Sequence, residues 1–75
     1  MNAMQIAERA DMIVAGYAYT LLEDYIEVTD LENPEKRAII QGDDVVESLM
    51  SDEEDDLILM YYRRNKSILE EALHA

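Results

Sequence analysis

The chain has 75 residues and carries 18 Asp and Glu against 6 Lys and Arg, for a formal net charge of −12, and it has no cysteine. The length accommodates one small domain, and the lack of cysteine excludes disulfides and cysteine-based zinc sites. The negative charge argues against direct binding of nucleic acid, which requires a positive field, and against binding to anionic membranes.

The first predicted element is a helix over residues 3–24. Its apolar residues recur at steps of three and four, as on one face of a helix: Ile6, Ala10, Ile13, Val14, Tyr17, Leu21 and Leu22. Gly16 lies inside this pattern and should cost about 1 kcal/mol relative to alanine. Met12 and Tyr19 fall outside the main apolar stripe, so we expect them to form part of an exposed interaction patch.

Three short strands are predicted next, over residues 25–31, 36–41 and 44–48. They are rich in β-branched residues and are separated by turn signals, Asn33-Pro34 and Gly42-Asp43. Gly42 in the first loop position predicts a two-residue hairpin of type II′. In that register Ile40 faces Val45, Ile39 faces Val46, Gln41 faces Asp44 and Ala38 faces Glu47.

An all-α alternative remains for part of this region. Val45, Val46, Leu49 and Met50 also fit a helical period, so residues 43–50 could form the middle helix of a three-helix domain. The hairpin is favoured because β-branched residues flank Gly42-Asp43 on both sides.

The last predicted element is a helix over residues 52–73. Ser51 and Glu54 have the spacing of a capping box, and the acidic residues that follow Ser51 suit the positive end of a helix dipole. The predicted fold is therefore α+β, a single domain over residues 1–75 of order α-β-β-β-α. In it, a three-stranded antiparallel meander packs against two helices.

The acidic residues at the start of this last helix are the most conspicuous candidate site, with Asp52, Glu53, Asp55 and Asp56 as its members. The simplest interpretation is a helix cap with a solvated face. They lack the alternate spacing and central glycine of a calcium loop, so no metal is expected. A functional interpretation is a docking surface for a basic protein, in its sharpest form a nucleic-acid mimic that occupies a basic nucleic-acid-binding groove.

Two other residues of the last helix are candidates for an interface. Met60 is expected to lie off the core-facing stripe and to join Met12 and Tyr19 in an interaction patch. Asn65 falls on the apolar stripe, where a polar side chain needs a partner. It is expected either to bond a strand backbone or to specify the register of a helix pair.

Nothing in the sequence indicates catalysis or a cofactor. It has no cysteine and no spacing typical of a catalytic site, and its single histidine is His74. The longest apolar run, residues 57–62, has six residues, whereas a membrane-spanning helix needs about 20. With no recognisable leader and no cysteine, we expect a cytoplasmic, non-enzymatic accessory protein. It would bind another protein, and homodimerisation is the favoured form.

Overall fold

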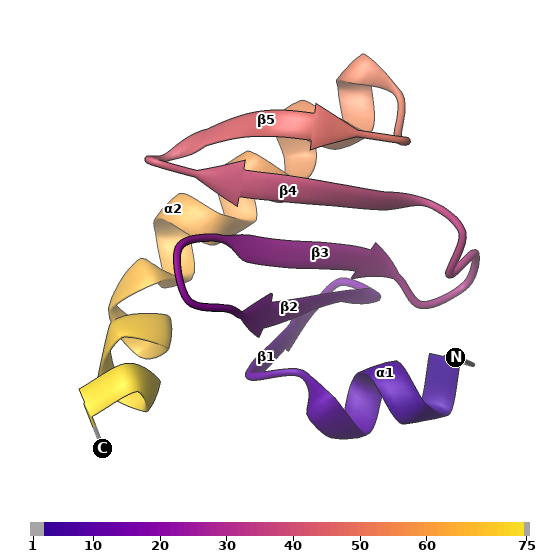
Figure 1. Ribbon diagram of the computed structural model, residues 1–75. Helices are drawn as coiled ribbons and strands as arrows, with labels where there is room; N and C mark the ends of the chain where they lie inside the picture. Colours follow the sequence, from indigo (N-terminus) through magenta and orange to yellow (C-terminus); the bar gives the residue numbers. More distant parts are fainter. Residues whose placement is uncertain (1–2, 75) are drawn as a thin grey trace.

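The structure, a computed structural model, describes residues 3–74, with side chains described for residues 4–68. It contains, in chain order, α1 (Ala3–Arg9), β1 (Met12–Val14), β2 (Tyr17–Leu21), β3 (Ile26–Asp30), β4 (Arg37–Gln41), β5 (Asp44–Ser48) and α2 (Asp52–His74) (Figure 1). The strands form one five-stranded antiparallel sheet, and their order in the sheet follows the sequence. The protein is therefore a small α+β domain.

The three predicted strands correspond to β3, β4 and β5, so the all-α alternative is wrong. In the last hairpin Ile40 faces Val45 and Gln41 faces Asp44, as the sequence predicts. Gly42 and Asp43 have φ values of 61° and 67°. Positive φ at both positions makes the turn type I′ rather than the predicted type II′, and the twist of type I′ matches that of the strands.

A bulge in β5 changes the rest of the predicted register. Ile39 lies opposite Glu47 rather than Val46, and Ala38 lies opposite Ser48 rather than Glu47. Val46 has no partner on β4, which is the pattern of a β-bulge. The extra residue places the Glu47 carboxylate beside Ile39, on the face of the sheet opposite the buried Ala38 and Ile40.

The predicted helix over residues 3–24 is wrong beyond Arg9, where α1 ends. Ala15 and Gly16, at φ values of 52° and 84°, form a two-residue turn between β1 and β2. Within each strand the side chains that face the core are two residues apart, as are Met12 and Val14 or Tyr17 and Tyr19. Across the turn, Val14 and Tyr17 are three residues apart. That spacing imitates a helix.

Strand pairing also satisfies the backbone where α1 ends. The Asp11 N–H donates to the Tyr19 carbonyl at 2.9 Å, and the Asp11 carboxylate accepts a hydrogen bond from the Leu21 N–H at 2.8 Å. Asp11 therefore bonds to β2 through both its backbone N–H and its side chain, and α1 does not continue through it.

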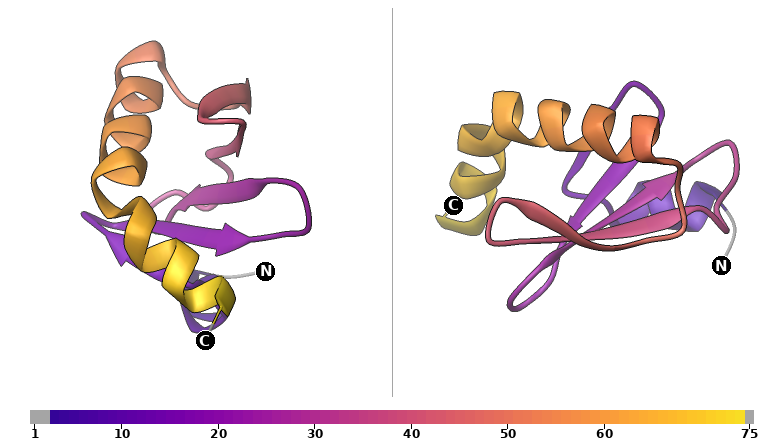
Figure 2. Two further views of the ribbon diagram at one scale, coloured as in Figure 1. Left: turned by 90° about the vertical axis from the view of Figure 1, so that its left-hand side faces the viewer. Right: turned by 90° about the horizontal axis from the view of Figure 1, so that it is seen from above.

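The core lies between α2 and one face of the sheet (Figure 2). Its buried side chains are Met12, Tyr17, Tyr19, Ile26, Val28, Ala38, Ile40, Ile58 and Tyr62. The Tyr19 hydroxyl donates to the Ile58 carbonyl at 2.7 Å and so attaches α2 to β2. The expected exposed patch of Met12 and Tyr19 is wrong, because both residues alternate onto the covered face of their strands and are buried there.

The opposite face of the sheet is covered only at one end. Ala18 and Thr29 pair across β2 and β3 and are buried, and α1 packs against β2. At that end, Ile6 of α1 lines a cleft with Glu27 of β3 and Arg37 of β4, and no described helix lies over the rest of this face on β3, β4 and β5. Figure 1 looks onto that face, with α2 behind the strands.

Candidate functional site

We call the uncovered surface of β3, β4 and β5 the open face. It consists of Tyr25, Glu27, Arg37, Ile39, Gln41, Val46, Glu47 and Leu49, which line two adjoining shallow clefts. Three of its apolar side chains are exposed: Tyr25 by 40%, Val46 by 52% and Leu49 by 69%. Large apolar side chains gathered on one uncovered sheet face are typical of an interaction surface.

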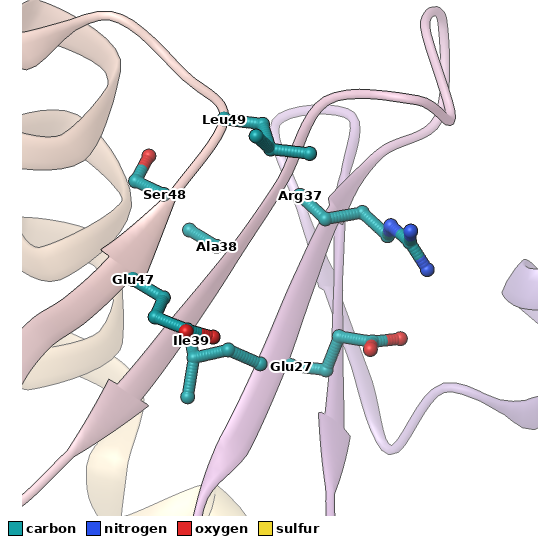
Figure 3. Close-up of a pocket in the computed structure, with 7 residues that line it drawn as sticks. All are labelled: Glu27, Arg37, Ala38, Ile39, Glu47, Ser48 and Leu49. Carbon is teal, nitrogen blue, oxygen red and sulfur yellow. The ribbon is translucent and has the colours of Figure 1, made fainter.

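Ile39 is the centre of the open face. It pairs with Glu27 on β3 and with Glu47 on β5, so a carboxylate lies on each side of it. Figure 3 shows these three side chains with Arg37 and Leu49 around the larger cleft, which has a volume of about 440 Å³. The Leu49 N–H donates to the Arg37 carbonyl at 2.8 Å, and this bond extends the ladder beyond β5.

Arg37 supplies positive charge to this face. Its side chain is exposed, and it forms no ion pair with the residues whose side chains are described. Glu27 and Glu47 are its diagonal neighbours on the adjacent strands, at a separation of about 7–8 Å between Cα atoms. The guanidinium therefore remains available to a carboxylate of another molecule.

The acidic residues at the start of α2 divide between solvent and structure. Asp52, Glu53 and Asp56 are exposed, whereas the half-buried Asp55 accepts a hydrogen bond from the Ser48 hydroxyl. The Ser51 hydroxyl accepts the Glu54 N–H at 3.2 Å, as the capping box predicts. The block is thus a helix cap with three solvated carboxylates, and none of its residues lines the two clefts of the open face.

Glu54 joins this cap to the sheet. Its carboxylate forms an ion pair with Lys36 at 3.3 Å and accepts a hydrogen bond from the Tyr17 hydroxyl at 3.4 Å. Partial burial raises the pKa of Glu54, but the hydrogen bond and charge of Lys36, with hydrogen bonds from Ser51, outweigh it and hold that pKa below its ordinary value. Burial and the charge of Glu54 raise the pKa of Tyr17.

The remaining candidates of α2 lie elsewhere. Met60 is 39% exposed and lines a shallow depression with Asp56 on the outer side of α2. The Asn65 amide donates to the Tyr61 carbonyl of its own helix at 2.9 Å, so the predicted bond to a strand backbone is wrong. The structure brings Met60 and Asp56 together, but it separates both from Met12 and Tyr19.

The basic residues of α2 are engaged with the last hairpin. Lys66 pairs with the Asp43 carboxylate at 3.1 Å, and an Arg63 N–H donates to the Asp43 carbonyl at 3.3 Å. The hydrogen bonds from Lys66 lower the pKa of Asp43. Lys66 thus pairs with an acidic side chain of the same chain, and Arg63 bonds the backbone of the same turn.

The described residues contain neither a cluster of metal ligands nor a membrane-spanning helix. No group of three or more His, Asp or Glu side chains there is close enough to hold a metal ion. No helix in this part of the chain is both long and apolar enough to cross a membrane. The side chain of His74 lies outside the described residues.

The open face was missed in the sequence because it depends on pairing between strands. Ile39, Glu27 and Glu47 are separated in the chain, and only the register places them in one row. A signal did exist, since the alternation of Arg37, Ile39 and Gln41 with Ala38 and Ile40 assigns the first three to one face of β4. The sequence also predicted one helix over residues 3–24 where the structure has α1, β1 and β2. With that helix available to cover the sheet, nothing indicated that this face is uncovered.

Comparison with known protein families identifies the family of the chain. Residues 1–69 match a family of unknown function, DUF7723. No curated protein and no solved structure matches the chain.

Proposed function

Because the chain belongs to DUF7723, a family of unknown function, we propose a function from the surface of the molecule: a non-enzymatic, self-associating protein-interaction module. The open face is its docking surface, and a second copy of the chain is the occupant. The lack of cysteine favours a cytoplasmic accessory role.

The exposure of Tyr25, Val46 and Leu49 around the half-buried Ile39 is the observation that supports this proposal. These side chains come from β4, from β5 and from the residues directly before β3 and after β5. They form one continuous surface, so burying them would remove a contiguous apolar area from water. Such burial is the main favourable contribution to association. In a chain of net charge −12, an apolar surface is also where two copies can approach with the least repulsion.

The dimensions of the molecule agree with a modest interface. The principal extents are 30 × 25 × 21 Å, so one broad face projects to roughly 750 Å², near the ~800 Å² that each partner contributes to a standard interface. Since α1 covers one end of this face, the buried area falls at the low end of that class. We expect a dissociation constant on the order of micromolar.

Pairing between sheet edges is a weaker route to the same dimer. β5 is an edge strand, but its bulge at Val46 interrupts the regular ladder, and Asp44 and Glu47 place acidic charge along it. Bulges and charges are features by which proteins prevent edge-to-edge pairing. The other edge, β1, has only three residues.

The test measures solution mass over a range of protein and salt concentrations, by light scattering behind a sizing column. We expect a mass near twice 8.7 kDa at high protein concentration, with little dependence on salt, because apolar contacts dominate. Ile39→Lys should give a monomer. Met60→Lys is the matched control, since it introduces the same charge at another partly exposed apolar side chain, and it should leave the dimer intact.

A monomer at every concentration would refute the proposal, and so would a dimer that survives Ile39→Lys. The nucleic-acid mimic is then the alternative to examine. It requires binding to a basic groove that weakens steeply with salt and is lost when Asp52, Glu53 and Asp56 are changed to their amides.

A further inference from the structure

We propose that the two copies meet about a two-fold axis that runs along the diagonal Tyr25–Ile39–Leu49, so that Arg37 of each copy pairs with Glu47 of the other. This inference rests on the proposed self-association and specifies its geometry. It follows from the register of the three strands that form the open face.

The register arranges the open face as three rows across β3, β4 and β5. The central row is Glu27, Ile39, Glu47. Towards one end, Thr29 pairs with Arg37, and Arg37 is bonded through its carbonyl to Leu49. Towards the other end, Gln41 pairs with Asp44, and Tyr25, which precedes β3, lines the same cleft as Gln41.

One diagonal of this arrangement is entirely apolar. Tyr25 lies at one corner, Ile39 at the centre and Leu49 at the opposite corner. Arg37 is adjacent to both Ile39 and Leu49 on one side of the diagonal, and Glu47 is adjacent to the same two residues on the other side. Opposite charges therefore flank an apolar line at equivalent positions.

A two-fold rotation about that line brings each apolar residue against its own equivalent and exchanges the two sides. Arg37 then faces the partner's Glu47, twice by symmetry, and Glu27 faces the partner's Gln41. Such a self-complementary patch is what an isologous dimer requires. Arginine and carboxylate form the strongest hydrogen-bonded ion pairs in proteins, and the rotation makes the strands of the two sheets cross steeply, as in orthogonal sheet packing.

Other axes through Ile39 are not complementary. An axis along β4 places Arg37 against itself, and an axis along the central row places Glu27 and Glu47 against themselves. The second diagonal pairs Arg37 with the partner's Glu27, but it places Asp44 against itself and runs through Thr29, which is buried beneath other groups. Like charges in direct opposition disfavour each of these arrangements.

Charge exchange between two singly substituted proteins tests the axis. Arg37→Glu and Glu47→Arg should each weaken self-association by roughly tenfold, because each creates two like-charged contacts. A mixture of the two proteins, labelled with different fluorophores, should form a heterodimer with nearly the affinity of the unsubstituted dimer, since one ion pair is kept as it is and the other is restored with reversed polarity. An ion pair within one copy cannot produce this rescue.

Two controls complete the design. Arg64→Glu, on the outer side of α2, changes the net charge by the same amount as Arg37→Glu and should leave the dimer unchanged. A mixture of Arg37→Glu with Glu27→Arg should remain dissociated, and rescue by that pair would establish the second diagonal and overturn the inference. If Ile39→Lys abolishes the dimer but neither mixture is rescued, the open face is an interface with a different axis. If the unsubstituted chain is monomeric throughout, the proposed function fails together with this inference.

Discussion

The two faces of the sheet are formed by alternating residues of the same strands, yet they differ in what covers them. On β4, Ala38 and Ile40 are each 1% exposed beneath α2, whereas Arg37, Ile39 and Gln41 point to the open face. On β3, Val28 is fully buried and Glu27 is not. Five strands and one long helix therefore complete one core and leave a second apolar surface without a partner among the described elements.

We expect the covered face to determine the stability of the monomer and the open face to determine its self-association. On the covered side, every described buried side-chain polar atom has a hydrogen-bond partner, and Tyr19 and Glu54 attach α2 to the strands. On the open face, Arg37 has no ion-pair partner among the described side chains. Substitutions beneath α2 should therefore alter the folding of the monomer, and substitutions on the open face should alter self-association.

The largest expected effect comes from the core. Ile58→Ala should lower the free energy of unfolding by about 3 kcal/mol, because it removes a fully buried side chain and leaves a cavity. Leu49→Ala, on the open face, should change it by less than about 0.5 kcal/mol. Urea denaturation at protein concentrations below self-association measures both values, and equal losses would contradict the division between the faces.

A smaller effect should come from one hydroxyl group. Tyr19→Phe removes the buried bond to the Ile58 carbonyl and should cost about 1 kcal/mol, which is roughly 4–8 °C in melting temperature for a domain of this size. Tyr25→Phe is the matched change on the open face and should leave the melting temperature unchanged. A loss confined to Tyr25→Phe would reverse the roles that we assign to the two faces.

The smallest effect should appear at the edge of the covered face and should depend on pH. The pKa of Glu54 is held below its ordinary value of 4.5 in the folded chain. Its stabilising contribution is therefore present above pH 4.5 and is lost as the pH falls through the lowered pKa. Glu54→Gln should melt at a lower temperature than the unsubstituted protein at neutral pH, and the difference should vanish once the pH falls below the lowered pKa of Glu54.

Glu53→Gln provides the control for this measurement. It removes the same charge from the same helical turn, but its side chain is exposed. A pH-dependent loss of equal size in both variants would assign the effect to net charge rather than to the contacts with Lys36 and Tyr17.

Local signals predicted the second half of the fold. Ser51 and Glu54 mark the start of α2 through contacts three residues apart, and the Gly42-Asp43 turn brings Ile40 opposite Val45. Both depend on residues that are close in sequence, where residue type and spacing carry most of the information.

The first half and the candidate site depend on information that no local window contains. The Ala15-Gly16 turn made two strands resemble one helix, and Tyr19 was consequently placed on the surface rather than in the core. The bulge at Val46 moved Glu47 opposite Ile39. The open face is uncovered because α2 packs on the other side of the sheet. Tertiary packing determines which side α2 covers, and no local sequence signal reports it.

The sequential order of the strands has a consequence for the folding reaction. Each strand pairs with the next along the chain, so the sheet can assemble by successive closure of short loops, which carries a low entropic cost and is fast. The contact between Tyr19 and Ile58 instead joins residues 39 positions apart. Docking of α2 therefore closes a much longer loop than the pairing of neighbouring strands does, and we expect it to follow that pairing. In any state that precedes docking, both faces of the sheet are exposed to other chains in solution.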